Sequence, residues 1–350
     1  MIWRRHFRLA LFYLRLVGVA AVSSMLIALF AAHGALPAAF SVLPQSGAGI
    51  EPARRLFEAG NYSPAIVALK NLVAQNASNA EAHFWLGRAY YESKNLSDAV
   101  AEGERSIALD PKNSNYHRWL GEYYGEQADR ESSFSLARKV KKEFEDAVRL
   151  DGSNIDARRD LEEFNLQAPW IVGGSKDAAR EQADAIAAID PIEGHLARAE
   201  YDLQVLKKSD LAANEYREVL EAHPGKIEPY LEVADVYRQS NRPAEMEPAL
   251  QGAERVKPSD PRISFYRAVQ HILANDQVSS AEPLLKSYIA NTPDRSDWPS
   301  HAAARYWLGR AYEEEGKRQE AAEQYRAALQ LDSRFKEASS RLQALEKNAK

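Results

Sequence analysis

Apolar residues recur along the chain at helical spacing, and the arrangement itself repeats. An apolar Trp-Leu pair is followed by glycine and, three positions later on the same helical face, by tyrosine; the copies span 85–90, 119–124 and 307–312. The first two copies begin 34 residues apart, at positions 85 and 119. This is the period of a two-helix repeat, whose units bury their apolar faces only by stacking on one another. The pattern predicts an all-α solenoid.

Small, aromatic and proline residues follow the motif at regular positions. In 80–113, Ala99 and Pro111 follow it, although Gly103 stands where an aromatic residue is expected, and 302–335 continues with Ala321 and Tyr325. These residues resemble the tetratricopeptide repeat family, which places Leu-Gly and Tyr on a first helix, Ala and an aromatic on a second, and Pro at the exit. The resemblance implies a right-handed superhelical solenoid of about eight helix-turn-helix repeats that ends in a capping helix.

The repeat pattern can be followed over residues 50–349. The expected units lie near 46–79, 80–113, 114–154, 155–192, 193–226, 227–260, 261–294 and 302–335, and a capping helix is expected at 336–349. Extra residues near 127–135 lengthen the helices of the third unit, and a long inter-helix loop is expected at 167–174. A further linker at 294–301 separates the last two units.

The amino terminus indicates export. Four arginines, at positions 4, 5, 8 and 15, precede the apolar stretch 16–32, and no charged residue follows before Glu51. Positive charge before an apolar run predicts a cytoplasmic amino end and an exported body. We expect a signal peptide or membrane anchor at 1–34, with membrane association through 16–34 if it is not cleaved, and a flexible linker at 35–49. The expected location is extracytoplasmic, either periplasmic or secreted.

Composition narrows the possible functions. The 45% hydrophobic and 27% charged content is that of a folded globular chain, and the absence of cysteine excludes disulfides and thiolate metal sites. Beyond the four amino-terminal arginines, 41 basic residues stand against 50 acidic ones. A body this acidic is a poor general binder of nucleic acid, so no nucleic-acid partner is expected.

No catalytic constellation is visible in the sequence. The eight histidines are scattered without a His-Glu-x-x-His pattern, so neither a metal nor a cofactor is expected. His83 and His117 occupy equivalent positions of neighbouring units, where packing is the better interpretation. Gly173-Gly174-Ser175-Lys176-Asp177 lacks the spacing of a phosphate loop and is interpreted as a helix-capping turn. Trp170 beside it could be buried or exposed.

The expected function is therefore binding without catalysis. First helices of such repeats line a concave groove, where a protein or peptide partner would lie. The aromatic and arginine character of an interaction hot spot selects a candidate set of residues: Phe84, Arg88, Tyr91, Arg118, Glu122, Tyr306 and Arg310. Packing of Phe84 and Tyr91 between repeats is the alternative. Two other functions stay open, a small-ligand or enzymatic module at 167–177 and a self-assembling structural protein; partner identity and oligomeric state are open as well.

Overall fold

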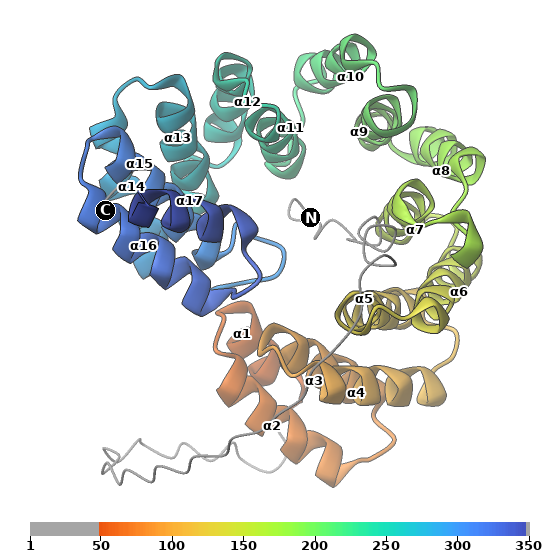
Figure 1. The fold of residues 1–350 in the computed structure, drawn as a ribbon. Coiled ribbons are helices and arrows are strands. Elements are labelled where there is room, and N and C mark those ends of the chain that lie inside the picture. The colour runs from red at the N-terminus through yellow and green to blue at the C-terminus, as the bar shows by residue number, and fades with distance from the viewer. Residues whose placement is uncertain (1–48, 348–350) are drawn as a thin grey trace, which may run out of the picture.

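The computed structural model describes residues 49–347 and is entirely helical over that range (Figure 1). The expected signal or anchor segment at 1–34 and nearly all of the linker lie outside the described residues. The first helices of successive pairs are α1 (Glu51–Glu58), α3 (Ala80–Glu92), α5 (Ser114–Glu131), α7 (Ile155–Gln167), α9 (Pro191–Tyr201), α11 (Glu228–Gln239), α13 (Pro261–Ala274) and α15 (His301–Glu314). Their partners are α2 (Tyr62–Gln75), α4 (Leu96–Leu109), α6 (Phe134–Leu150), α8 (Lys176–Ile189), α10 (Ser209–Glu221), α12 (Pro243–Val256), α14 (Val278–Asn291) and α16 (Arg318–Leu331).

Three further elements complete the described chain. A 3-10 turn, η2 (Trp170–Val172), lies between α7 and α8, a π-helical turn, η3 (Asp202–Leu206), follows α9, and α17 (Lys336–Lys347) packs against α16. No helix among residues 49–347 combines the length and the apolar character that crossing a bilayer requires.

Asparagine side chains set the start of several first helices. Asn79, Asn113 and Asn154 each cap a helix and accept a hydrogen bond from a backbone N–H of its first turn. These N–H groups have no partner within the helix, so a capping side chain typically contributes about 1 kcal/mol. The caps therefore fix the residue at which each of these first helices begins.

The glycine of the repeated motif is a close-packing position, and its partner differs between pairs. A Cβ on Gly121 would come within 2.4 Å of the Phe144 ring, and one on Gly309 within 2.6 Å of the Tyr325 ring. In the α3–α4 pair the equivalent aromatic position is Gly103, and there a Cβ on Gly87 would meet backbone instead, 3.2 Å from the Ala99 carbonyl oxygen and 3.4 Å from the Gly103 nitrogen. The missing aromatic ring thus lets the two helices approach backbone to backbone.

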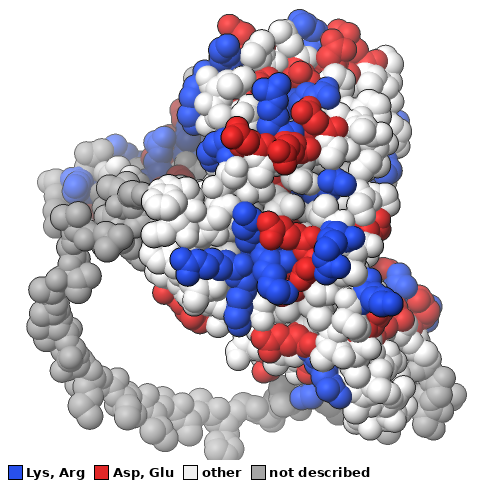
Figure 2. All heavy atoms as spheres, turned by 90° about the vertical axis from the view of Figure 1, so that its right-hand side faces the viewer, with Lys and Arg blue, Asp and Glu red and all other residues white. Residues whose placement is uncertain are grey.

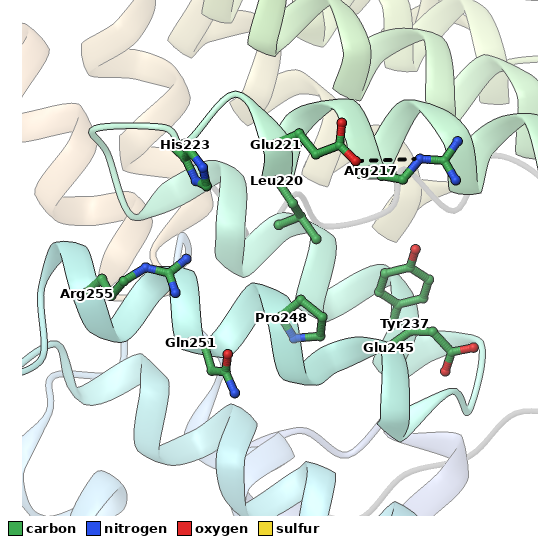
Figure 3. A pocket seen from close by; sticks show the side chains of 9 residues that line it. All are labelled: Arg217, Leu220, Glu221, His223, Tyr237, Glu245, Pro248, Gln251 and Arg255. Carbon is green, nitrogen blue, oxygen red and sulfur yellow. Dashed lines mark ion pairs between the residues drawn. The ribbon is translucent and has the colours of Figure 1, made fainter.

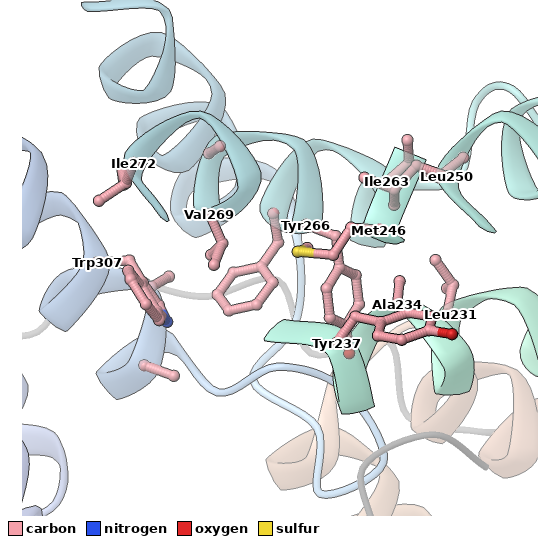
Figure 4. Close-up of a cluster of buried hydrophobic side chains, with 14 of the residues drawn as sticks. Leu231, Ala234, Tyr237, Met246, Leu250, Ile263, Tyr266, Val269, Ile272 and Trp307 are labelled. Carbon is pink, nitrogen blue, oxygen red and sulfur yellow. The ribbon is translucent and has the colours of Figure 1, made fainter. Parts of the chain in front are cut away.

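The stacked pairs bury two large apolar clusters. One runs from Leu196 to Ala338 and includes the side chains of Figure 4, where Tyr266, Met246 and Trp307 come from three different pairs. The other runs from Tyr91 to Val172. Each helix pair is thereby joined to the next by side chains from both, as expected of a repeat architecture in which units contact only their neighbours.

The solenoid curves until its two ends meet, so that the blue end of the chain lies beside the orange beginning in Figure 1. Residues 292–300, here called the closing loop, join α14 to α15 and reach the first repeat. The backbone nitrogen and hydroxyl of Ser296 donate to the two carboxylate oxygens of Glu92 at 2.9 and 2.6 Å. Pro293 lies so close to Gly60 that a Cβ there would clash at 2.2 Å.

A second contact reinforces the ring. Arg334, in the turn before α17, lies 3.5 Å from Glu126 and 3.6 Å from Asp129 of α5. The residues at 294–301, which the sequence suggested only as a linker, thus cover the amino-terminal repeat.

Candidate partner-binding surface

The structure places three of the candidate residues inside a continuous stack between α3 and α5. The Phe84 ring stacks on Tyr116 with centroids 4.8 Å apart, and the Tyr91 ring lies 5.1 Å from Tyr123. The Arg88 guanidinium sits 3.9 Å from the Trp119 ring centroid. All of these side chains bridge neighbouring repeats, which is the packing alternative that the sequence left open for Phe84 and Tyr91.

Arg118 joins the next two first helices, α5 and α7. Its side chain is buried, and its Nε donates to Asp160 at 2.5 Å while Nη1 lies 3.7 Å from Asp156. Burial alone would lower the pKa of Arg118, but the charges of Asp160, Asp156 and Glu122 outweigh that cost and raise it. Glu122, on the same helix, is half-buried. Arg118 therefore holds two repeats together.

Tyr306 and Arg310 lie apart from this group, in the carboxy-terminal apolar cluster. Tyr306 packs against Tyr325 and Phe335, with centroids 5.8 and 5.2 Å away. Arg310 lies over the Trp307 ring at 5.6 Å and pairs with Glu314 at 3.6 Å. The candidate residues thus form two separate groups on the first helices. Contact of any of them with a partner stays a prediction.

A charged cluster on α7, α9 and α11 is the feature that the candidate set missed. Arg159 of α7 is 1% exposed, and its Nη2 donates to Glu232 of α11, two pairs further along the chain. First helices two pairs apart approach only on the inside of a curve, so this bond marks the concave side. Arg159 holds the fifth place of its unit, as Arg118 does, so the rule that selected Arg118 would have found it.

Carboxylates outnumber cations around this arginine. Glu162, Glu193, Glu200 and Glu232 surround Arg159, and although burial would lower its pKa, their charges raise it. We call these five residues the Arg159 cluster. Two nitrogens of the guanidinium, Nε and Nη1, have no hydrogen-bond partner among the described residues. The cluster therefore combines unused donors with an excess of negative charge.

Histidine–glutamate pairs tie first helices to second helices. His117 Nδ1 lies 2.7 Å from Glu143 and Nε2 lies 3.1 Å from the Pro111 carbonyl. His83 has the same arrangement with Glu102 and the Ala77 carbonyl. For His117, the carboxylate at one nitrogen and the carbonyl at the other favour the doubly protonated imidazolium.

Among the described residues, one group has donor atoms close enough to hold a metal: His117, Glu143 and Asp146. Its acids already have cationic partners, because Asp146 pairs with Lys142 at 2.7 Å and with Arg149 at 2.8 Å. The His117 nitrogens are also engaged. The geometry is that of an ion-pair network which ties α5 to α6.

This network predicts a pH-dependent stability. Burial would lower the pKa of His117, but the hydrogen bonds to Glu143 and to the Pro111 carbonyl, with the charge of Glu143, raise it above 6.5. The stabilisation is fully present below the unfolded pKa and is lost as pH rises through the folded one. We expect the difference in unfolding free energy between wild type and His117→Gln to shrink as pH rises, measured by urea denaturation.

The matched variant is Glu143→Gln, which removes the carboxylate and should abolish most of this pH dependence. A wild-type minus His117→Gln difference that stays constant or grows with rising pH would contradict the assignment. The His117 imidazole titration, followed by NMR, gives the folded-state pKa directly.

The 167–177 loop is a fixed turn with its polar groups engaged. Ser175 caps α8, accepting from the Ala178 nitrogen at 3.3 Å. The backbone nitrogens of residues 172–174 donate within the turn, to Pro169 and Trp170 carbonyls. These N–H groups are not available to cradle a phosphate, so the turn serves to cap the helix. The open question about Trp170 is also answered, because its side chain is 76% exposed.

A groove on the second-helix side lies between α10 and α12 (Figure 3). Its volume is about 450 Å³, and its lining residues are Arg217, Leu220, Glu221, His223, Tyr237, Glu245, Pro248, Gln251 and Arg255. Arg217 and Glu221 pair at 3.9 Å across one edge. Charges of both signs around an apolar floor give a surface suited to contact rather than to acid–base chemistry.

These features define a curved helical-repeat protein with a polar, partly acidic inner wall. The family model for the tetratricopeptide repeat matches residues 52–114 and 266–334. These two stretches of the chain are therefore similar to tetratricopeptide repeats. No curated protein matches the sequence.

Solved structures resemble the fold at low sequence identity. Yeast Tom70 is 15% identical, with 82% of this chain and 59% of that chain covered and a TM-score of 0.57. A tetratricopeptide repeat protein from Parabacteroides merdae is 14% identical, with 76% and 98% covered and a TM-score of 0.47. PilF of Pseudomonas aeruginosa is 16% identical, with 63% and 95% covered and a TM-score of 0.42. The likeness to Tom70 supports the fold alone.

Proposed function

We propose that the protein is a non-catalytic interaction scaffold that holds a partner segment against the inner wall of its ring. In this proposal the segment ahead of the repeats exports the protein or tethers it to the cytoplasmic membrane through residues 16–34. Tetratricopeptide repeats suggest a protein-interaction role, and the curved wall offers a continuous surface for an extended or helical segment.

The Arg159 cluster carries this proposal. One guanidinium among four carboxylates leaves the wall with excess negative charge, and a partner segment rich in Lys or Arg would neutralise it. A basic peptide segment of a protein therefore fits this wall best.

Phe84 and Arg118 are poor positions for a test, because both hold repeats together. A sharper variant replaces Glu122, Glu193 and Glu200, which are all partly exposed, by glutamine, which removes charge while keeping side-chain shape. We expect at least about tenfold weaker capture of partners, since each charge-assisted hydrogen bond contributes roughly 1.5–3 kcal/mol. The measurement is crosslinking with a membrane-impermeant reagent on spheroplasts that express the full chain, followed by quantitative recovery.

The matched control carries the same substitutions at exposed glutamates of second helices: Glu181, Glu218 and Glu323. Equal recovery for the inner-wall and control variants would refute binding at the inner wall. Crosslinks that form only with a membrane-permeant reagent would instead refute the extracytoplasmic location, so the two parts of the proposal fail separately.

A further inference from the structure

The turn between α7 and α8 presents two large apolar side chains to solvent. Trp170 is 76% exposed and is the most exposed large apolar side chain among residues 49–347, and Ile171 next to it is 46% exposed. Below them Val172 is buried, 2% exposed, and anchors the turn in the apolar cluster. Exposed neighbouring apolar residues of this size mark an interaction site more often than an isolated exposed side chain does.

The turn is held rigidly in this protruding form. Arg138 of α6 donates to the Ile171 carbonyl at 3.3 Å, and Lys141 of α6 donates to the Gly173 carbonyl at 2.7 Å. Gly173 adopts a φ of +102°, and a Cβ on Gly174 would overlap the Ala168 carbonyl. The apolar pair therefore cannot fold back onto the protein without breaking these contacts, and no ordering is required before it binds.

Cations surround the turn. Arg138, Lys141 and Lys176 each bind one of its backbone carbonyls, with the Lys176 ammonium on the Leu166 carbonyl. We call these three residues the cationic collar. Burial and the nearby Lys207 ammonium lower the pKa of Lys176, and Lys207 adds a further cation beside the collar.

Acidic residues near the turn are fewer than the cations. Glu145 lies 3.5 Å from Lys141, and Asp177 follows Lys176 in the first turn of α8. Glu163 accepts a hydrogen bond from Gln167 at the start of the turn, so with Lys207 four cations stand against three carboxylates. Figure 2 faces the side of the ring where α6 and α8 lie, and Lys and Arg side chains gather at the middle of that face with Asp and Glu among them.

We propose that the Trp170 turn docks on an anionic phospholipid surface, with Trp170 and Ile171 entering the headgroup region and the cationic collar on lipid phosphates. Tryptophan and isoleucine beside Arg and Lys are the combination that the membrane interface favours. A rigid, convex turn needs no matching pocket in its target, which favours a bilayer over a protein. This surface is separate from the inner wall, so a scaffold docked here would keep its ring open to partners.

The absence of cysteine allows a single reporter thiol. The full-length Ile171→Cys variant, labelled with the polarity-sensitive dye NBD, is mixed with phosphatidylcholine vesicles with or without phosphatidylglycerol. We expect a blue-shifted, brighter emission only with phosphatidylglycerol, reversed by high salt because the attraction is screened. The same label at exposed Gln319 on α16 is the control and should not respond.

Two further variants in the Ile171→Cys background separate the contributions. Trp170→Ala should weaken the response about tenfold or more, the effect of losing burial of one large apolar side chain. Lys176→Gln should weaken only the part of the fluorescence response that depends on phosphatidylglycerol. Circular dichroism melting checks that each variant is folded.

Three results would overturn the proposal. The first is that the protein sediments with anionic vesicles while the emission of the label at residue 171 does not shift. Binding would then be assigned to the amino-terminal segment alone. Another is an equal response at residue 319, which would indicate unspecific adsorption. The last is that a photocrosslinker placed at residue 171 reacts with protein and not with lipid in native envelopes. That result would assign the turn to a protein partner.

Discussion

Replacing Arg159 by alanine is expected to lower the free energy of unfolding by about 3–5 kcal/mol. The guanidinium is fully buried and is the cation that faces Glu162, Glu193, Glu200 and Glu232. Without it, four carboxylates from three repeats would repel one another with no cation between them, and the buried Glu162 would lose its compensating charge. Urea denaturation followed by far-ultraviolet circular dichroism measures the loss.

Two controls isolate this effect. Arg217→Ala removes an arginine of similar helical context whose side chain is 60% exposed, and it should change stability by no more than about 0.5 kcal/mol. The double variant Arg159→Met with Glu232→Met should recover part of the loss, because an apolar pair replaces the ion pair. A cost below about 1 kcal/mol for Arg159→Ala would show that the carboxylates do not depend on this cation.

Replacing Glu92 by alanine is expected to open the ring. Glu92 is 6% exposed and accepts both hydrogen bonds from Ser296. Bonds to a charged group contribute roughly 1.5–3 kcal/mol each, so closure should weaken by about 3 kcal/mol or more. Small-angle X-ray scattering should show a larger radius of gyration. Helix content should be unchanged, since α3 remains packed on α4 and α5.

Two variants define what the Glu92 result means. Ser296→Ala removes only the hydroxyl bond and should produce a smaller expansion than Glu92→Ala. Arg334→Ala removes ion pairs of a side chain that is 56% exposed and should cost less than about 1 kcal/mol of closure. If Glu92→Ala is folded and scatters like wild type, then the closing loop is held by other contacts.

The repeat architecture could be predicted from the sequence because its cause is local. Gly121 and Gly309 recur at a fixed place in the motif, and the rings that pack on them, Phe144 and Tyr325, recur at a fixed place on the second helix. Even the departure at Gly103 has a local effect, the closer approach of α3 and α4. A period in the sequence carries this information because each unit contacts mainly its neighbours.

The binding wall was harder to predict, because helical position alone does not fix exposure. Phe84, Arg88 and Arg118 occupy groove positions of the pattern, yet the curvature presses their helices together, so that Phe84 and Arg118 are buried and Arg88 is half-buried. Arg159 and Glu232 meet across α9 for the same reason. Curvature is the sum of small rotations between repeats and has no signature at a single residue.

Ring closure could not be predicted from the sequence either. Glu92 and Ser296 lie 204 residues apart and belong to no shared motif. The residues around Ser296 break the period, so they suggested only a linker. Contacts of this kind depend on the pitch of the whole chain, to which every repeat contributes.

The contact between the first and last repeats changes how the molecule can deform. An open solenoid behaves as a spring, since small rotations at each joint add up and its pitch and width vary freely. Once its ends are joined, a rotation at one joint must be compensated at others around the circumference. The hydrogen bonds between Ser296 and Glu92 therefore affect the whole molecule, because they hold the diameter of the ring constant.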